Sequence, residues 1–391
     1  MAAQHIKPTI VITGGNFVNK GAESMLMSTV NAIRENFPAY EPVLLDLFPT
    51  VKAADKEQYS FRIVNMHVRS LYRICFPLFK LLYKPKAISN SETEIKVTIN
   101  SASAIFDISG YGLSSHNQQL MWSIAYLLPM YMAKKKGIPV WLLPQSMGPF
   151  QFKGIKKWLF QLLAIPVLKY PEIIFVRETS GLEALRQFRK KPTELSPDIV
   201  LQTPEAKIGE SVATHSDSGV LVIPNQQLFR VVSKEATLQL YASLIHQVLD
   251  QGIPVKVIQH SNDDRAFCDL LESRISHPMF TADNKVRSLE ALHEAIKASR
   301  FIISGRYHGA IHALKLLKPV IIIGWAEKYR HLASMFGMNE LLIDLGDGEV
   351  PSSIDGIVNR LLAHEQDLIT NFERQLRQIR QDNFWQRIHL K

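Results

Sequence analysis

The sequence predicts an α/β protein with two Rossmann-like, doubly wound domains, and three observations lead to this expectation. Short apolar runs alternate with amphipathic runs of helical length through both halves of the chain, a rhythm typical of parallel sheets covered by helices. The segment 204–219 between the halves is polar and contains no aromatic residue. The length of 391 residues corresponds to roughly two or three domains of ordinary size.

In the N-terminal half, short apolar runs predict strands at residues 9–13, 42–47, 104–109, 138–144 and 172–176. Longer runs between them predict helices at residues 22–36 and 117–136. We expect these elements to form a first domain over residues 1–205, followed by a linker at residues 206–218.

The C-terminal half repeats the pattern, with predicted strands at residues 219–224, 253–259, 300–304, 319–325 and 341–345. The predicted helices between them are residues 234–251, 263–275 and 288–299. These elements predict a second domain over residues 219–365. Residues 366–391 are predicted to be a charged helix, which should dock back on the body because Phe384 and Trp385 need an apolar surface.

Composition and charge restrict the class of partner. The chain has 46% hydrophobic and 21% charged residues, which is ordinary for a globular protein. Its formal net charge of +9 favours anionic partners, such as nucleic acid, an acidic membrane surface or a phosphorylated small molecule. Nucleic acid is not expected, because the cations are spread along the chain and no nucleic-acid-binding motif is present.

Cysteine usage and hydropathy indicate the compartment. Cys75 and Cys268 lie far apart and outside any metal-binding pattern, which fits a reducing environment. The apolar run near the N-terminus is too short for the hydrophobic part of a signal peptide. No run reaches the roughly 18 apolar residues of a membrane-spanning helix. We therefore expect a cytoplasmic protein.

Ligands of doubly wound domains bind at the carboxyl ends of strands, so the cleft between two such domains is the expected site. After the first predicted strand, Gly14 and Gly15 form a turn through which backbone N–H groups could approach an anion or a sugar. Asn19 lies further along the same loop. The turn matches neither a dinucleotide-binding nor a P-loop pattern, and an ordinary tight turn is the alternative interpretation.

Two later strand ends carry candidate polar groups. Asp107 lies at the end of an apolar strand, before a turn that contains Gly110 and Tyr111, and it is either a structural acid or a site residue. Gln145 and Ser146 follow another predicted strand and could contribute neutral hydrogen bonds.

An arginine ends the last predicted strand of this half. Arg177 follows an apolar run and precedes a predicted helix. It is expected either to pair with a carboxylate, for which Glu178 is the nearest candidate, or to bind a ligand.

The most informative stretch is ISGRYHGAIH, where a predicted strand ends and a helix begins. Arg306 supplies a fixed charge suited to a carboxylate or phosphate. His308 lies in the first helical turn, where the helix dipole lowers its pKa and a bound dianion would raise it, so it is a candidate acid. His308 and His312 have metal-ligand spacing, but no carboxylate accompanies them and a metal is not expected. Lys328 could reach the same anion or be a solvated helix charge.

The segment ASRFIISGRYHGAIHALKLLKPVIIIGWAEKYRHLASMFG closely resembles the C-terminal signature of the polysaccharide pyruvyl transferase family. Five earlier stretches resemble motifs of that family in the same order: GGNFVNKGAE, DISGYGL, QSMGPF, VRETSGLEAL and SPDIV. The resemblance covers residues 8–340.

The resemblance implies the fold of the type B glycosyltransferases and transfer of pyruvate from phosphoenolpyruvate to sugar hydroxyls as a ketal, in cell-surface or exopolysaccharide biosynthesis. By motif, Arg177 and Arg306 would bind the carboxylate and phosphate of the donor. His308 would be the catalytic acid or base, and Asp107 would lie close to the saccharide acceptor. This chemistry requires a proton donor, a base and cations, and neither a metal nor another cofactor. Tyr111 stands where the family tends toward a glycine run, which leaves the acceptor open.

Two other functions remain as alternatives. One is a nucleotide-sugar-dependent glycosyltransferase of the same fold, whose diphosphate could bind at the same helix start. The other is a non-catalytic relative that binds a glycan or a lipid.

Two basic amphipathic stretches suggest a location. Residues 68–86 and 152–163 combine Lys and Arg with aromatic residues and Leu, and such stretches can lie at an anionic bilayer surface. Peripheral contact with the inner membrane face would suit an acceptor carried on a lipid diphosphate. A solvated basic helix face over the core is the other interpretation.

Overall fold

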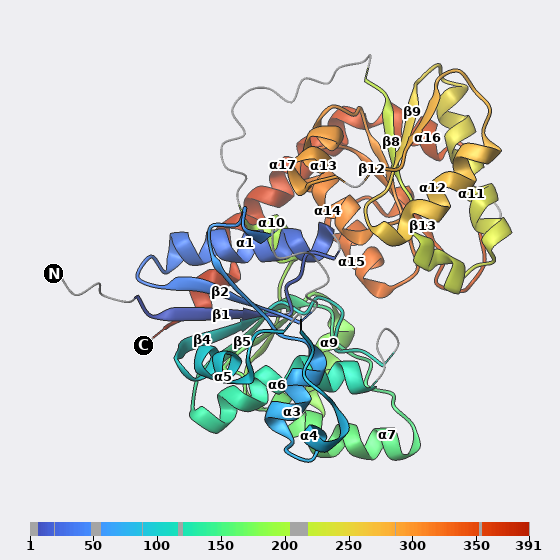
Figure 1. The fold of residues 1–391 in the computed structure, drawn as a ribbon. Helices are drawn as coiled ribbons and strands as arrows, with labels where there is room; N and C mark the ends of the chain where they lie inside the picture. Colours follow the sequence, from blue (N-terminus) through green and yellow to red (C-terminus); the bar gives the residue numbers. More distant parts are fainter. Residues whose placement is uncertain are drawn as a thin grey trace. The chain divides into compact units, whose positions relative to one another are not determined.

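The computed structural model describes residues 7–18, 20–47, 56–87, 89–115, 120–203, 218–285, 287–351 and 354–390. The chain forms two compact units (Figure 1). The N-terminal unit comprises residues 1–18, 22–199 and 383–391, and the C-terminal unit comprises residues 19–21 and 200–382. The predicted linker, residues 206–218, lies outside the described residues except for its last position.

Within the described residues, the N-terminal unit is built on a parallel seven-stranded sheet in the order β3-β2-β1-β4-β5-β6-β7. The strands are β1 (Thr9–Thr13), β2 (Glu41–Asp46), β3 (Arg62–Asn65), β4 (Ala102–Asp107), β5 (Val140–Gln145), β6 (Ile174–Val176) and β7 (Thr193–Leu195). Sequence patterns did not predict β3 and β7, because these short edge strands contain polar and partly exposed residues instead of an apolar run.

Helices cover this sheet, and most residues of the long helix α6 are buried. The helices of this part of the chain are α1 (Lys20–Asn36), α3 (Val68–Cys75), α4 (Phe79–Leu82), α5 (Glu92–Asn100), α6 (Leu120–Lys136), α7 (Gly154–Leu159), α8 (Ile165–Leu168), α9 (Thr179–Arg186) and α10 (Ile199–Gln202), with a π-helical turn η1 (Phe160–Ala164) between α7 and α8. Helix α6 packs against α3, α5, η1 and α8. Helix α6 corresponds to the predicted helix 117–136. It is described from Leu120, because residues 117–119 lie outside the described residues.

The described part of the C-terminal unit is built on a parallel six-stranded sheet in the order β10-β9-β8-β11-β12-β13. The strands are β8 (Val220–Ile223), β9 (Val255–Ile258), β10 (Phe280–Asp283), β11 (Ile302–Ser304), β12 (Val320–Gly324) and β13 (Leu342–Asp344). The edge strand β10 was not predicted, because its residues are partly exposed and its pattern is not apolar.

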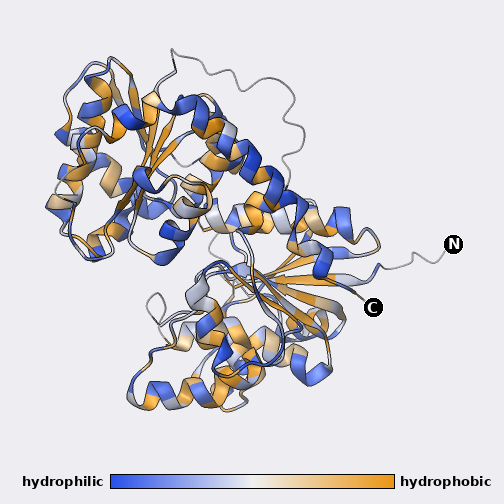
Figure 2. Cartoon of the chain, turned by 180° about the vertical axis from the view of Figure 1, so that it is seen from behind, coloured by the Kyte–Doolittle hydropathy of each residue, from blue (hydrophilic) through white to orange (hydrophobic). Residues whose placement is uncertain are grey.

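The helices of the C-terminal unit follow its strands along the chain. They are α11 (Lys234–Leu249), α12 (Arg265–Arg274), α13 (Leu289–Lys297), α14 (Tyr307–Lys315), α15 (Glu327–Met335), α16 (Ile357–Ala363) and α17 (Glu365–Gln381), with 3-10 turns η2 (Gln226–Arg230), η3 (Asn262–Asp264) and η4 (Asn339–Leu341). Serine side chains start two of the helices: Ser233 accepts a hydrogen bond from the N–H of Ala236, and Ser288 accepts one from the N–H of Ala291. Figure 2 shows hydrophobic strands in both sheets and helices that alternate between hydrophobic and hydrophilic residues.

The C-terminal segment divides between the two units at a different place from the predicted boundary. Helix α17 belongs to the C-terminal unit, where Asn371 donates to the carbonyl of Phe336 (2.6 Å). The 3-10 turn η5 (Phe384–Arg387) belongs to the N-terminal unit. Trp385 is buried there, with its ring centroid 6.0 Å from that of Phe106. Burial of an aromatic side chain of this size stabilises the fold by about 2–3 kcal/mol.

Candidate functional site

Both sheets reverse their strand order once, and the candidate residues lie at these reversals. In the N-terminal unit the reversal falls between β1 and β4, where Thr13 is the register partner of Asp107. In the C-terminal unit it falls between β8 and β11, where Ile223 is the partner of Ser304. The carboxyl ends of strands beside such a switch point are where doubly wound sheets bind ligands. Each unit therefore has one expected binding edge.

Asp107 is the centre of the N-terminal edge. Its carboxylate is fully buried and accepts hydrogen bonds from the hydroxyls of Thr13 (2.7 Å) and Ser109 (2.9 Å), the N–H of Ser109 (3.2 Å) and the side-chain amide of Gln145 (3.1 Å). Burial raises the pKa of Asp107 above its ordinary value, and these hydrogen bonds oppose the rise. The carboxylate thus ties together the ends of β1, β4 and β5.

The turn after β1 requires a glycine. Gly14 has φ +80°, a conformation that residues with a Cβ rarely adopt. A Cβ at this position would lie 2.4 Å from the hydroxyl oxygen of Ser109 and 2.5 Å from its backbone nitrogen. Gly15 follows in the same turn, against the side chain of Ile108. Asn19, which was expected further along this loop, lies outside the described residues.

Arg177 is the second charged group of the N-terminal edge, and it is almost completely buried. Its guanidinium pairs with Asp198 and donates to the hydroxyl of Ser146 (2.7 Å), while Glu178 lies at 3.9 Å. The hydroxyl of Ser146 in turn donates to Glu178 (2.7 Å). The principal carboxylate partner is therefore Asp198 and not Glu178, which the sequence indicated as the nearest candidate.

The turn after β4 lies beside this network. A guanidinium nitrogen of Arg177 is 3.5 Å from the carbonyl oxygen of Gly110, which also accepts from the N–H of Ser146 (2.8 Å). Gly110 has φ +68°. Tyr111 follows and is partly exposed. The N-terminal edge therefore brings together Gly14, Gly15, Asp107, Gly110, Tyr111, Gln145, Ser146 and Arg177 in one stretch of strand ends.

In the C-terminal unit, Arg306 is fixed at the start of α14 by a buried carboxylate. Its guanidinium makes a two-point contact with Asp264, at 2.9 Å from Nε and 2.5 Å from Nη2. The side chain of Arg306 is 17% exposed, whereas Asp264 is fully buried. Asp264 also accepts from the backbone N–H groups of Gln226 (3.1 Å) and Ser261 (3.0 Å). The guanidinium thus reaches the surface in a fixed orientation.

The residue before Arg306 is held by close packing. The carbonyl of Gly305 accepts from the side-chain amide of Asn225 (2.9 Å) and the hydroxyl of Tyr329 (3.1 Å). A Cβ at Gly305 would lie 2.3 Å from the hydroxyl oxygen of Tyr241. These contacts fix the direction in which the chain enters α14.

His308 and Lys328 are both near Arg306 in this unit. His308 is partly exposed in the first turn of α14, and its ring lies 5.4 Å from the ring of Tyr307. Lys328 lies in the first turn of α15, with its ammonium 5.3 Å from the ring centroid of Tyr307 and 5.4 Å from that of Tyr329. Arg330, the other cation of that helix, instead pairs with Asp344. A guanidinium, an imidazole and an ammonium therefore lie around one helix start, and the Nε2 atom of the imidazole is buried.

Three further histidines cluster around the later part of α14. His260 and His312 are buried, and the ring of His312 is hydrogen-bonded to His293 (2.9 Å). Burial lowers the pKa values of His260 and His312 well below the ordinary value, and the neighbouring cations add to this effect. Burial also lowers the pKa of His293, to about 4. These three rings are therefore neutral near pH 7. Within the described residues, no group of three or more His, Cys, Asp or Glu side chains could hold a metal ion.

Sequence patterns missed the residues that position the candidates. They are Thr13, Asp198, Asn225, Tyr241, Asp264 and Tyr329. Two of them had a visible signal, because Asp198 lies in the SPDIV motif and Asp264 lies in the SNDD stretch just after a predicted strand. The contacts themselves join residues 21 to 94 positions apart, which no local pattern shows.

Comparison with known proteins agrees with this architecture. A family model described as polysaccharide pyruvyl transferase matches residues 19–327. No sequence match was found among curated proteins. The match to the family model confirms the family resemblance of the sequence motifs.

Solved structures show the fold. An α,α-trehalose 6-phosphate synthase from Burkholderia multivorans is 11% identical, with a TM-score of 0.55 and 97% of each chain covered. A UDP-GlcNAc 2-epimerase from Methanocaldococcus jannaschii is 12% identical, with a TM-score of 0.54, 94% of this chain and 92% of the epimerase covered. An O-GlcNAc transferase mutant from Thermobaculum terrenum is 13% identical, with a TM-score of 0.50 and 98% of this chain covered; this chain spans 65% of its length. The predicted type B glycosyltransferase fold, with two parallel-sheet α/β domains, is confirmed.

Proposed function

Because the chain belongs to the polysaccharide pyruvyl transferase family, we propose that it transfers pyruvate from phosphoenolpyruvate onto two hydroxyls of a saccharide, as a ketal. The observation that carries this proposal is the helix start at Arg306, where a fixed guanidinium, His308 and Lys328 surround the N-terminus of α14. Phosphoenolpyruvate carries a phosphate and a carboxylate, and cations together with backbone N–H groups are suited to bind both.

In the proposed reaction, His308 protonates the methylene carbon of phosphoenolpyruvate, which makes C2 electrophilic. A saccharide hydroxyl adds to C2 and loses its proton. Phosphate then leaves from C2 with its bonding electron pair, and a second hydroxyl adds to the resulting oxocarbenium centre and loses its proton, which closes the ketal. Of the two protons released, one replaces the proton taken from His308 and the other is taken up by phosphate or solvent. Arg306 and Lys328 stabilise the charge of the departing phosphate.

The N-terminal edge suits the acceptor. Its charged side chains, Asp107, Arg177, Glu178 and Asp198, are buried and bonded to protein groups. This leaves mainly hydroxyl, amide and backbone groups for a neutral saccharide. We assign Asp107 and Arg177 as positioning residues, since both are nine-tenths or more buried and neither is open to a ligand. The acceptor proposed is a cell-surface polysaccharide or its precursor, modified in the cytoplasm.

A ligand titration by thermal shift tests the donor. Phosphoenolpyruvate should raise the melting temperature of the native chain, because a ligand that binds only the folded state stabilises it. Arg306→Ala should abolish this rise when each variant is compared with its own ligand-free melting temperature. Arg330→Ala is the matched control, since it removes an arginine of the same unit that pairs with Asp344.

Uridine and guanosine diphosphates complete the experiment. Stabilisation by a nucleotide diphosphate, with no response to phosphoenolpyruvate, would overturn the proposal in favour of a nucleotide-sugar-dependent transferase. If phosphoenolpyruvate alone stabilises the chain, release of phosphate from it should depend on an added saccharide, which screening of acceptor saccharides then identifies.

A further inference from the structure

One region of the N-terminal unit combines positive charge with exposed apolar side chains and has no role in the proposed reaction. It consists of three segments, residues 68–86, 120–136 and 152–169, which we call the basic apolar region. The segments contain five, three and four Lys or Arg residues, respectively, and no Asp or Glu. In a chain with 36 acidic residues, three such segments without any acid form a distinct positive surface.

The three segments are adjacent in the fold. Helix α6 packs against α3 on one side and against η1 and α8 on another, while α4 contacts α3 and α7 contacts η1. Figure 1 shows α3, α4, α6 and α7 grouped at the same end of the N-terminal unit. The charges of all three segments therefore act on one part of the surface.

Large apolar side chains are exposed in the same place. Among the described residues, ten large hydrophobic side chains are strongly exposed, and six of them lie within residues 78–82 and 155–162. The most exposed are Leu81 (86%), Leu78 (74%) and Ile155 (74%), and Trp158 is 59% exposed. Isolated exposed apolar residues are ordinary, but a contiguous group of them marks an interaction surface.

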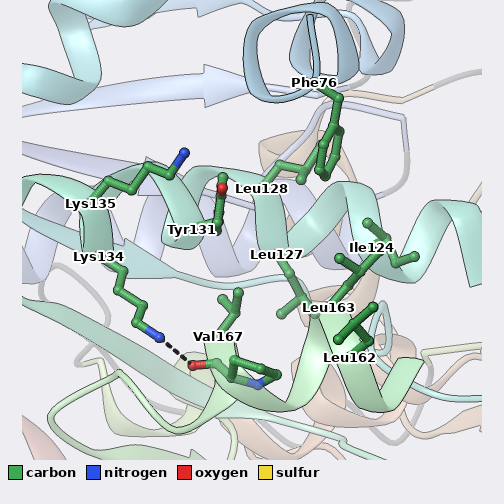
Figure 3. Close-up of a pocket in the computed structure, with 11 residues that line it drawn as sticks. Phe76, Ile124, Leu127, Leu128, Tyr131, Lys134, Lys135, Leu162, Leu163 and Val167 are labelled. Carbon is green, nitrogen blue, oxygen red and sulfur yellow. Dashed lines mark hydrogen bonds between the residues drawn. The ribbon is translucent and has the colours of Figure 1, made fainter. Parts of the chain in front are cut away.

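A pocket in this region is lined by residues of all three segments. It has a volume of about 370 Å³ and is lined by apolar side chains of α6 and of residues 162–167, together with Phe76. Figure 3 shows these side chains around the pocket, with Lys134 and Lys135 at one end. Lys134 donates to the carbonyl of Pro166 (3.0 Å), and the ammonium of Lys135 lies 4.5 Å from the ring of Tyr131. The opening thus has an apolar interior and a cationic rim.

We propose that the basic apolar region docks the protein on an anionic phospholipid bilayer, with Leu81, Ile155 and Trp158 inserted among the acyl chains. The charge pattern favours this occupant, because anionic lipid headgroups complement a surface of lysines and arginines without acids. The apolar side chains between the cations match the depth at which amphipathic elements lie in the interface. No helix among the described residues is long and apolar enough to cross a membrane, so the contact is peripheral. A bilayer-bound position would present the enzyme to saccharides that are carried on lipids.

Vesicle flotation tests the proposal without phosphoenolpyruvate or an acceptor, so its result is independent of the proposed reaction. The native chain should float with vesicles that contain phosphatidylglycerol, and more weakly at high salt. Leu81→Asp combined with Ile155→Asp should abolish flotation, whereas Val97→Asp, at an exposed apolar position of α5, should not. Lys156→Glu with Lys157→Glu should reduce the bound fraction at least about tenfold, whereas Lys234→Glu with Lys285→Glu, in the C-terminal unit, should leave it nearly unchanged.

Trp158 provides an internal probe of insertion. Vesicles of phosphatidylglycerol with brominated acyl chains should quench its fluorescence, and Trp158→Phe should keep flotation but lose most of the quenching. Failure of the native chain to float would overturn the proposal, as would equal losses in the control variants. Equal quenching in Trp158→Phe would overturn the proposed insertion of Trp158 among the acyl chains. Dimerisation of the native chain without vesicle binding would identify a second copy as the occupant instead.

Discussion

The two switch points have the same topology and opposite electrostatic character. In the N-terminal unit the central group is the carboxylate of Asp107, which is fully buried and surrounded by hydrogen-bond donors. In the C-terminal unit the central group is the guanidinium of Arg306, which reaches the surface and is fixed by Asp264 from below. The charged group of the N-terminal edge is thus enclosed by protein hydrogen-bond donors, whereas that of the C-terminal edge reaches the surface.

This difference teaches how one fold can divide the two substrates of a transfer reaction. A buried, compensated charge orders the strand ends and leaves neutral hydrogen-bonding groups for a ligand such as a saccharide. A surface cation that a buried counter-ion holds in place can bind an anion without reorienting, since its orientation is set before the ligand binds. The topology supplies the position, and the choice of residue at the strand end decides the chemistry.

The largest expected effect concerns His308, the proposed acid. It lies with Arg306 and Lys328 at the strand ends of the C-terminal unit, which we call the cationic edge. His308→Ala should lower the rate constant for phosphate release from phosphoenolpyruvate by roughly 10²–10⁴-fold, the usual contribution of a general acid. The melting-temperature rise caused by phosphoenolpyruvate should persist, because Arg306 and Lys328 remain. Steady-state phosphate release and thermal shift measure the two quantities separately.

His364→Ala is the matched control for that experiment, because His364 is an exposed histidine of the same unit. It should retain the native rate. A His308→Ala variant with native activity would show that His308 does not transfer the proton. The cationic edge would then bind the anion but have no catalytic role through this residue.

The next largest effect is a loss of unfolding free energy at the N-terminal edge, where Asp107 is buried. Asp107→Ala leaves the buried donors of Thr13, Ser109 and Gln145 without their acceptor, and unsatisfied buried groups of this kind cost about 1–3 kcal/mol in unfolding free energy. Denaturant unfolding measures this loss. Asp367→Ala, at an exposed carboxylate, should change the unfolding free energy by less than about 0.5 kcal/mol. Equal costs in the two variants would contradict the ordering role assigned to Asp107.

The pH dependence of stability sharpens the same point. Because burial raises the pKa of Asp107, the folded state holds this proton more tightly than the unfolded state. The resulting stabilisation is fully present below the ordinary pKa of 3.8 and is lost as the pH rises through the raised folded value. The stability of the native chain relative to Asp107→Asn should therefore fall over that window. A flat difference would mean that the hydrogen bonds fully offset the effect of burial.

The sequence predicted the two sheets and the strand ends that carry the candidates, because buried parallel strands are apolar runs and the polar residue that ends such a run is conspicuous. Asp107, Arg177 and Arg306 were found in this way. The edge strands β3, β7 and β10 were missed, since an edge strand buries too little surface to need a continuous apolar run.

The partners of these candidates could not be predicted for a different reason. Asp264 lies 42 positions from Arg306, and Asp198 lies 21 positions from Arg177. Both pairings depend on which strands become neighbours and in what register, and a pattern of period 2 or 3.6 contains no such information. Glu178, the candidate that the sequence indicated, does lie within ion-pair distance of Arg177 (3.9 Å), but the direct contact is made by Asp198, which adjacency in sequence could not indicate.

The smallest expected effect concerns the packing that aims Arg306. Two buried tyrosines approach Gly305, and they differ in hydrogen bonding: Tyr329 donates to its carbonyl (3.1 Å), whereas the hydroxyl of Tyr241 has no hydrogen-bond partner among the described residues. Tyr329→Phe should thus cost about 1 kcal/mol of unfolding free energy, and Tyr241→Phe should cost nothing or be slightly stabilising. Denaturant unfolding of the two variants provides the comparison. Equal costs would mean that close packing around Gly305, and not hydrogen bonding, sets the direction from which Arg306 enters the cationic edge.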